Sequence, residues 1–247
     1  MRSKNILAIL ILLVSSLESF AQYENLYAFF GVGQSYYQGD LNANAFPNGN
    51  ILNMSYKGGI GYNFHTRFGA QMHYTQSNLN GSDYFNNNAG MAARGLSFTS
   101  PLKEFGINFK LRNLNGKDGR WINYLFTGFN FFSFNPTVTK AESSETNYVA
   151  EDGYKKIGIN IPAGIGIGYW ATNNIGIVWE SALHITYTDY LDGVSKNGNA
   201  KYKDAFVDSH IMVLFRFGEW KGMRKGSQKK SKGFRMKKTR TISCPRF

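Results

Sequence analysis

The residues best suited to chemistry lie in the stretch Ile175–Ser195, which carries Glu180, His184, Asp189 and Asp192. Glu180 and His184 fall on one side of an alternating segment, where a histidine beside a carboxylate could serve a Ser-His-acid triad. No serine in a distinctive motif accompanies them. Asp189 and Asp192 offer the oxygen ligands that Ca²⁺ prefers, but two such loop carboxylates fit a loop-capping role better. We therefore expect no enzyme activity, no catalytic residue, no metal site and no cofactor.

The same stretch shows which element positions these side chains. Mostly hydrophobic residues occupy the odd positions from Ile175 to Tyr187, whereas Glu180, His184 and small residues occupy the even positions. A period of two predicts a strand with one apolar and one polar face. Seven further stretches are also predicted to be strands, at 25–38, 51–65, 68–79, 96–114, 121–135, 156–171 and 206–217, and most of them alternate in the same way, although the faces of 121–135 are hard to separate.

Eight strands of this kind are long enough to cross a membrane when tilted, and their connections alternate between long and short, with a long polar loop expected from 137 to about 154. We predict an all-β fold: an eight-stranded antiparallel up-and-down transmembrane β-barrel in the outer membrane, with both termini on the periplasmic, short-turn side. A soluble lipocalin-type barrel is the alternative. It conflicts with the charged residues on the face opposite the aliphatic one, because unpaired charges are costly in a dry core.

The inward face is expected to carry a network of ionisable side chains that plugs a narrow lumen. Inward glycines such as Gly164 and Gly166 fit a lumen too narrow for a diffusion pore. The predicted members of the network are Lys57, Glu104, Lys110, Glu180, His184 and Arg216.

The two ends of the chain differ from the predicted barrel, which spans residues 22–217. Residues 1–21 have the basic start, apolar run and small-residue cleavage site of a signal peptide. Residues 218–247 form a basic tail, expected in the periplasm, with 11 Lys or Arg against one Glu, or +10 of the net charge of +12. The tail could contact anionic lipid, peptidoglycan or a partner protein, but an exported protein is not expected to bind nucleic acid. Cys244, the one cysteine, indicates a free thiol or pairing with another chain.

Several segments together suggest a family. They are GVGQSYYQGDLN (31–42), RGLSFTSPLKEFGINF (94–109), FSFNP (132–136), TYTDYLDGVS (186–195) and the terminal CPRF (244–247), and the cleavage site FAQ looks like a Bacteroidota export signal. On these residues the chain resembles the PorG-like outer-membrane barrels of the Bacteroidota type IX secretion system. It departs from that family at Gly193, where a second Asp is usual, and in a shorter loop before the last strand.

The resemblance implies a non-enzymatic part of a protein secretion machine, a barrel that tethers or stabilises a periplasmic ring of PorK-like lipoprotein and PorN-like protein. It makes Cys244 the candidate for a disulfide with the ring lipoprotein. The other residues expected to contact the partner are Lys237, Lys238, Arg240, Pro245, Arg246 and Phe247. The alternative function is a small outer-membrane barrel that binds or modifies lipid or a ligand at its extracellular loops.

Overall fold

The computed structural model describes residues 25–39, 41, 53–83, 95–113, 119–140, 153–194 and 203–217. The predicted signal peptide, 1–21, and the basic tail, 218–247, lie outside these residues. In the described ranges, no helix is long and apolar enough to cross a membrane.

The described residues form strands joined by turns and loops. The strands are β1 (Leu26–Gln38), β2 (Asn53–Tyr62), β3 (Phe68–Ser82), β4 (Leu96–Arg112), β5 (Trp121–Phe134), β6 (Thr137–Lys140), β7 (Ile157–Trp170), β8 (Ile175–Thr186) and β9 (Ala205–Arg216).

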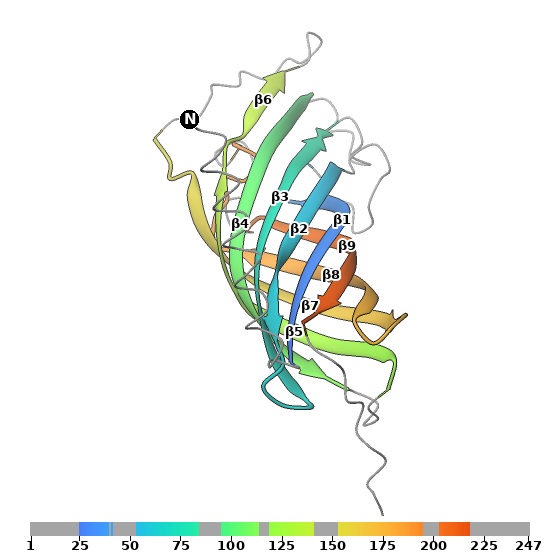
Figure 1. The fold of residues 1–247 in the computed structure, drawn as a ribbon. Helices are drawn as coiled ribbons and strands as arrows, with labels where there is room; N and C mark the ends of the chain where they lie inside the picture. The colour runs from blue at the N-terminus through green and yellow to red at the C-terminus, as the bar shows by residue number, and fades with distance from the viewer. Residues whose placement is uncertain are drawn as a thin grey trace, which may run out of the picture.

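Eight of these strands close into a barrel (Figure 1). Each long strand pairs with its neighbours in an antiparallel ladder, in the order β3-β2-β1-β9-β8-β7-β5-β4, and the β3–β4 pairing closes the circle. The first and last long strands, β1 and β9, pair over twelve positions, from Tyr27 opposite Arg216 to Gln38 opposite Ala205. The predicted eight-stranded antiparallel barrel is confirmed.

The two faces of each strand differ as the alternation predicts. On β8, Ile177 is 50% exposed and Trp179 is 44% exposed on the outside. The alternate residues, Val178 and Glu180, point inward and are fully buried. The same contrast runs round the barrel, so that its outer surface is covered with Phe, Ile, Leu, Met, Trp and Tyr side chains. The apolar residues therefore face outward over most of the barrel wall.

One sequence prediction about a loop is wrong in part. The connection expected as a long polar loop from 137 begins with strand β6, which pairs with the outer end of β4 from Leu96 opposite Lys140 to Thr99 opposite Thr137. β5 pairs with β4 only from Leu102 onward, so the longer β4 leaves ladder positions open. The residues after Pro136, Thr-Val-Thr, favour strands, and they pair with these open positions of β4 as strand β6.

Pro162 breaks the ladder on one side of β7. The pairing between β5 and β7 passes from Thr127 opposite Ala163 directly to Asn130 opposite Asn160, whereas Pro162 stays in register with His184 on β8. Proline has no amide hydrogen to donate, so it occupies a position where one neighbouring ladder is interrupted.

Candidate functional site

The barrel interior is built in three layers. Near the short turns lies an apolar and aromatic cluster, made of Tyr27, Phe29, Ile122, Tyr124, Phe126, Trp170, Val178, Ala182, Met212 and Leu214. Near the long loops lies a second one, made of Tyr37, Leu41, Leu79, Leu96, Phe98, Leu102, Phe132, Phe134, Leu191, Val194 and Phe206. Between them lies a polar layer whose ionisable side chains are only 0–3% exposed: Lys57, His73, Glu104, Lys110, Glu180, His184, Asp208 and His210.

This layering corrects the expectation of a uniformly polar lumen. An eight-stranded barrel is only wide enough for packed side chains. Inward residues near both ends are large and apolar, and they cover the charged groups from either mouth. The polar layer is the candidate functional site, because it holds most of the buried ionisable side chains. Such charges stay buried only where partners hold them.

Glu180 on β8 is held by three side chains. Its Oε1 lies 2.7 Å from Lys57 Nζ on β2, and its Oε2 lies 3.5 Å from Lys110 Nζ on β4. The Tyr124 hydroxyl donates to Oε2 at 2.6 Å. Both carboxylate oxygens are thus held by groups from three other strands, which join opposite walls of the barrel.

A second set of contacts extends this group across the lumen. Lys57 Nζ also lies 3.8 Å from Asp208 Oδ2, and Asp208 Oδ1 lies 3.3 Å from His184 Nε2. The other ring nitrogen of His184, Nδ1, lies 3.2 Å from Glu104 Oε2, and Glu104 Oε1 lies 3.3 Å from His73 Nε2. The layer is therefore one continuous chain of alternating basic and acidic groups, which we call the ionic chain: Lys110, Glu180, Lys57, Asp208, His184, Glu104 and His73.

The composition of the ionic chain sets its charge. It contains three carboxylates, of Glu104, Glu180 and Asp208, and two lysines. Both ring nitrogens of His184 lie beside carboxylate oxygens, a geometry that is favourable when both nitrogens carry a hydrogen. With His184 as the third cation, the chain is neutral, which is the condition for burying so many ionisable groups.

Glycine makes one contact of the layer possible. Tyr124 on β5 is paired with Gly166 on β7, and Gly166 is paired with Glu180 on β8. A Cβ atom at Gly166 would overlap the Tyr124 ring. The absence of a side chain there lets the ring lie across β7 and place its hydroxyl on Glu180.

The structure brings five of the six predicted network residues into the ionic chain. These are Lys57, Glu104, Lys110, Glu180 and His184. Arg216 lies elsewhere: its guanidinium carbon is 3.9 Å from the centroid of the Trp170 ring, in the cluster near the short turns. A cation over an indole face is a favourable pair, so Arg216 has a partner of a different kind.

The predicted network omits two members of the ionic chain, His73 and Asp208. The alternation that places His210 on the inward face of β9 places Asp208 there too, so the signal was present. Two contacts of Asp208, with Lys57 on β2 and His184 on β8, are ones that no local pattern indicates. A third is local, since His210 Nδ1 on the same strand lies 3.5 Å from Asp208 Oδ2. His210 completes this corner: its Nε2 lies 2.8 Å from Ser55 Oγ.

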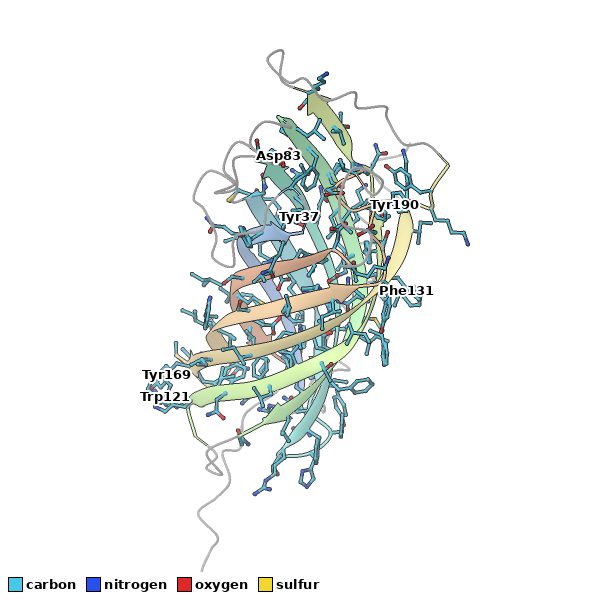
Figure 2. The ribbon with its side chains drawn as sticks, turned by 180° about the vertical axis from the view of Figure 1, so that it is seen from behind. Tyr37, Asp83, Trp121, Phe131, Tyr169 and Tyr190 are labelled. Carbon is cyan, nitrogen blue, oxygen red and sulfur yellow. The ribbon has the colours of Figure 1, made fainter. Side chains whose placement is uncertain are left out.

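The acidic loop after β8 holds part of the outer cluster in place. Asp192 Oδ1 accepts a hydrogen bond from the Val194 amide at 2.9 Å, and its Oδ2 lies 2.8 Å from the Tyr37 hydroxyl. Asp204 accepts from the Leu191 amide at 2.9 Å and lies 2.6 Å from the same hydroxyl. Figure 2 shows Tyr37 and Tyr190 at this outer end of the barrel. These bonds are of the loop-capping kind, and no cluster of metal-ligating residues occurs in the described ranges.

The residues expected to contact a partner, from Lys237 to Phe247 and including Cys244, lie outside the described residues. The described part of the short-turn end includes the turns between β2 and β3 and between β7 and β8. It also includes Asn25 before β1, residues 113 and 119–120 between β4 and β5, and Phe217 after β9.

Solved structures with a similar architecture include bacterial surface and outer-membrane proteins. Neisserial surface protein A is 10% identical to this chain, with a TM-score of 0.49. The match covers 77% of this chain and 96% of that protein. Ail of Yersinia pestis, in complex with the heparin analogue sucrose octasulfate, is 10% identical, with a TM-score of 0.43 and 78% and 98% coverage. A major outer membrane protein from Thermus thermophilus is 10% identical, with a TM-score of 0.44 and 77% and 99% coverage. Similarity at this level transfers no function.

Among curated proteins, none matches this chain. A family profile does match, over residues 4–219, which include every described strand. The chain belongs to the family described as a domain of unknown function, DUF6089.

Proposed function

We propose that this protein is an outer-membrane barrel of a type IX protein secretion machine that anchors a periplasmic ring through its basic tail. The observation that carries the proposal is a barrel that is apolar outside and closed inside. The resemblance to PorG-like barrels supplies the type of machine, and the tail supplies the candidate docking segment.

The outer surface supports insertion into a membrane. Strands β7 and β8 have 14 and 12 residues, more than the roughly 9–11 that a tilted strand needs to span the hydrocarbon core. Trp121 and Tyr169 pack edge to face at 5.4 Å on the outside near the short turns (Figure 2), where membrane barrels carry an aromatic girdle. In water, the exposed Phe, Ile and Leu side chains would form an apolar patch far larger than soluble proteins tolerate.

The closed interior favours an anchor over a pore. The ionic chain and the two apolar clusters fill the described part of the lumen, and the side chains of the ionic chain are at most 3% exposed. A barrel held by buried ion pairs from opposite walls is a rigid element, suitable for attaching a large assembly to the membrane.

The tail, 218–247, is the proposed contact with the ring. In bacterial outer-membrane barrels the short turns face the periplasm, and the last strand, β9, ends at the short-turn end. The surplus of Lys and Arg in the tail suits an acidic partner surface, and Cys244 can form a disulfide with a partner thiol in an oxidising compartment.

The proposal is tested by capture from membranes under non-reducing conditions. The tagged full-length protein is expected to yield a crosslinked band with the ring lipoprotein that disappears on addition of a thiol. Cys244→Ser should lose the band, and truncation after Phe217 should also lose non-covalent capture. Ser243→Ala is the matched control and should behave as wild type.

A second measurement distinguishes loss of the partner from loss of the fold. Folded outer-membrane barrels migrate differently on a gel before and after heating, and all variants should retain that shift. Normal secretion by both Cys244→Ser and the truncated protein would refute the tethering role. The loop-binding alternative would then be favoured if His184→Ala or Asp189→Ala gave the phenotype instead.

A further inference from the structure

The charged residues of the described surface are of one sign. The seven acidic residues in the described ranges are all buried: Asp83, Glu104, Glu180, Asp189, Asp192, Asp204 and Asp208. The exposed charged residues in those ranges are all basic: Arg67, Lys103, Arg120, Lys140, Lys155, Lys156 and Lys203. A surface of this kind attracts anions, which at a membrane are the phosphates of lipid headgroups.

Lys103 is placed differently from the other exposed basic residues, because it lies on the outer face of a barrel strand. Below it on β4, the outward positions are Phe105, Ile107, Phe109 and Leu111, all apolar, and above it is Pro101. The neighbouring strand β3 changes at the same point, since Tyr74 is paired with Phe105 and Gln76 is paired with Lys103. Lys103 is thus at the upper edge of the apolar band, the depth of lipid headgroups.

An apolar groove begins directly below Lys103. It has a volume of about 280 Å³, its floor is at Gly106, and it is lined by Phe105, Ile107, Phe109, Phe129 and Phe131. Figure 2 shows Phe131 on the outside of the barrel wall. Ser133 on β5, which is exposed, is paired with Lys103 at the head of the groove.

A second groove runs on the other side of the ridge formed by Tyr74 and Phe105. It has a volume of about 440 Å³ and is lined by Phe30, Tyr56, Tyr74 and Gln76 around Gly58. Gly58 is an outward position between Phe30 on β1 and Tyr74 on β3, so its missing side chain gives the groove its depth. The two grooves therefore flank one ridge whose upper end carries Gln76 and Lys103.

We propose that this surface binds a phosphate-bearing lipid, with the phosphate on Lys103 and acyl chains in the two grooves. The ammonium of Lys103 has no ion-pair or hydrogen-bond partner among the described residues, so it is available for a phosphate. Ser133 and Gln76, on either side, can donate hydrogen bonds to the same headgroup. The proposal depends on insertion into a membrane and not on the periplasmic ring.

The test titrates the purified, folded full-length protein in detergent with dioleoyl phosphatidylglycerol, and in parallel with lipid A. Bound lipid is counted by native mass spectrometry, with zwitterionic phosphatidylcholine as the reference. Anionic lipid is expected to bind at lower concentration than phosphatidylcholine. The better ligand of the two anionic lipids identifies the source, a glycerophospholipid or a lipopolysaccharide.

The variants separate the headgroup contact from the groove. Lys103→Gln should weaken binding of anionic lipid about fivefold, the effect of one Lys near a lipid phosphate. Ile107→Trp, which fills the first groove, should weaken binding of the preferred anionic lipid. The matched controls are Lys140→Gln, an exposed Lys on β6, and Ile177→Trp, an outward residue on β8, and both should bind as wild type. The basic tail is present in every variant and contributes equally.

Two outcomes would overturn the proposal. One is an unchanged affinity of Lys103→Gln for both anionic lipids, with the heat-dependent gel shift showing that the variant is folded. The other is binding of phosphatidylcholine as tight as that of the anionic lipids. Neither outcome bears on capture of the periplasmic ring, so failure here is distinguishable from failure of the proposed function.

Discussion

Lys57→Met tests whether the ionic chain stabilises the barrel. Within the described residues, Lys57 is the one lysine that contacts two carboxylates, at 2.7 Å from Glu180 and 3.8 Å from Asp208, and it is 1% exposed. Methionine has a similar length but no charge, so the three carboxylates would retain two cations, Lys110 and protonated His184. Removing one partner of a buried ion pair costs about 3–5 kcal/mol, because the remaining charge stays buried.

A loss of about 4 kcal/mol lowers the ratio of folded to unfolded protein roughly a thousandfold. The assay is urea-dependent unfolding of the barrel in lipid vesicles, followed by tryptophan fluorescence and by the heat-dependent gel shift. Lys140→Met is the matched control: Lys140 is exposed on β6, so the change should stay within about 0.5 kcal/mol.

A second substitution distinguishes charge imbalance from lost packing. In the double variant Lys57→Met with Glu180→Gln, the chain regains electrical balance, with two carboxylates, Lys110 and His184. It should therefore be more stable than Lys57→Met alone. A Lys57→Met protein that unfolds within about 1 kcal/mol of wild type would refute the reasoning, since a buried cation with two carboxylate partners cannot be that dispensable.

Two further predictions concern the inner and outer faces of the wall. Gly166→Ala should destabilise the barrel by about 1–3 kcal/mol, because the added methyl displaces the Tyr124 ring from Glu180. Urea titration measures it, and Gly119→Ala, with nothing within 4 Å, is the control; equal stability of the two variants would contradict the account of Gly166. Ile165→Arg, on the outer face near the middle of β7, should cost about 2–4 kcal/mol in vesicles because it places a charge in the hydrocarbon. Thr99→Arg, outward on β4 above the apolar band, should be nearly neutral, and a neutral Ile165→Arg would speak for a soluble barrel.

Much of the wall could be predicted from local sequence. Alternation along the segment around Ile177 and Trp179 places each side chain inside or outside, because successive residues of a strand point to opposite faces. The interrupted ladder at Pro162 likewise follows from local chemistry, because proline has no amide hydrogen to donate. β6 could not be predicted in this way: Thr137–Lys140 becomes a strand only because β4 extends past the end of β5 and offers unpaired positions.

The sequence could likewise predict part of the candidate site but not its contacts. Lys57, Glu104, Lys110, Glu180 and His184 could be assigned to one lumen, because each is an inward residue in a strand of clear period. Which of them touch could not be predicted, since the contacts join strands far apart in sequence, such as Lys57 on β2 with Glu180 on β8. Arg216 illustrates the limit: its inward position was predicted, but its height in the barrel gives it Trp170 as a partner and not a carboxylate.

By itself, the sequence determined a long-stranded barrel with an apolar exterior, because a period of two is a property of each strand alone. Only the tertiary structure decided that the interior is layered and that three carboxylates, two lysines and His184 form one neutral chain. It also decided that Lys103 lies at the head of two apolar grooves. The physical reason is that strand register sets the height of every side chain, and register arises only when eight strands close into one ladder.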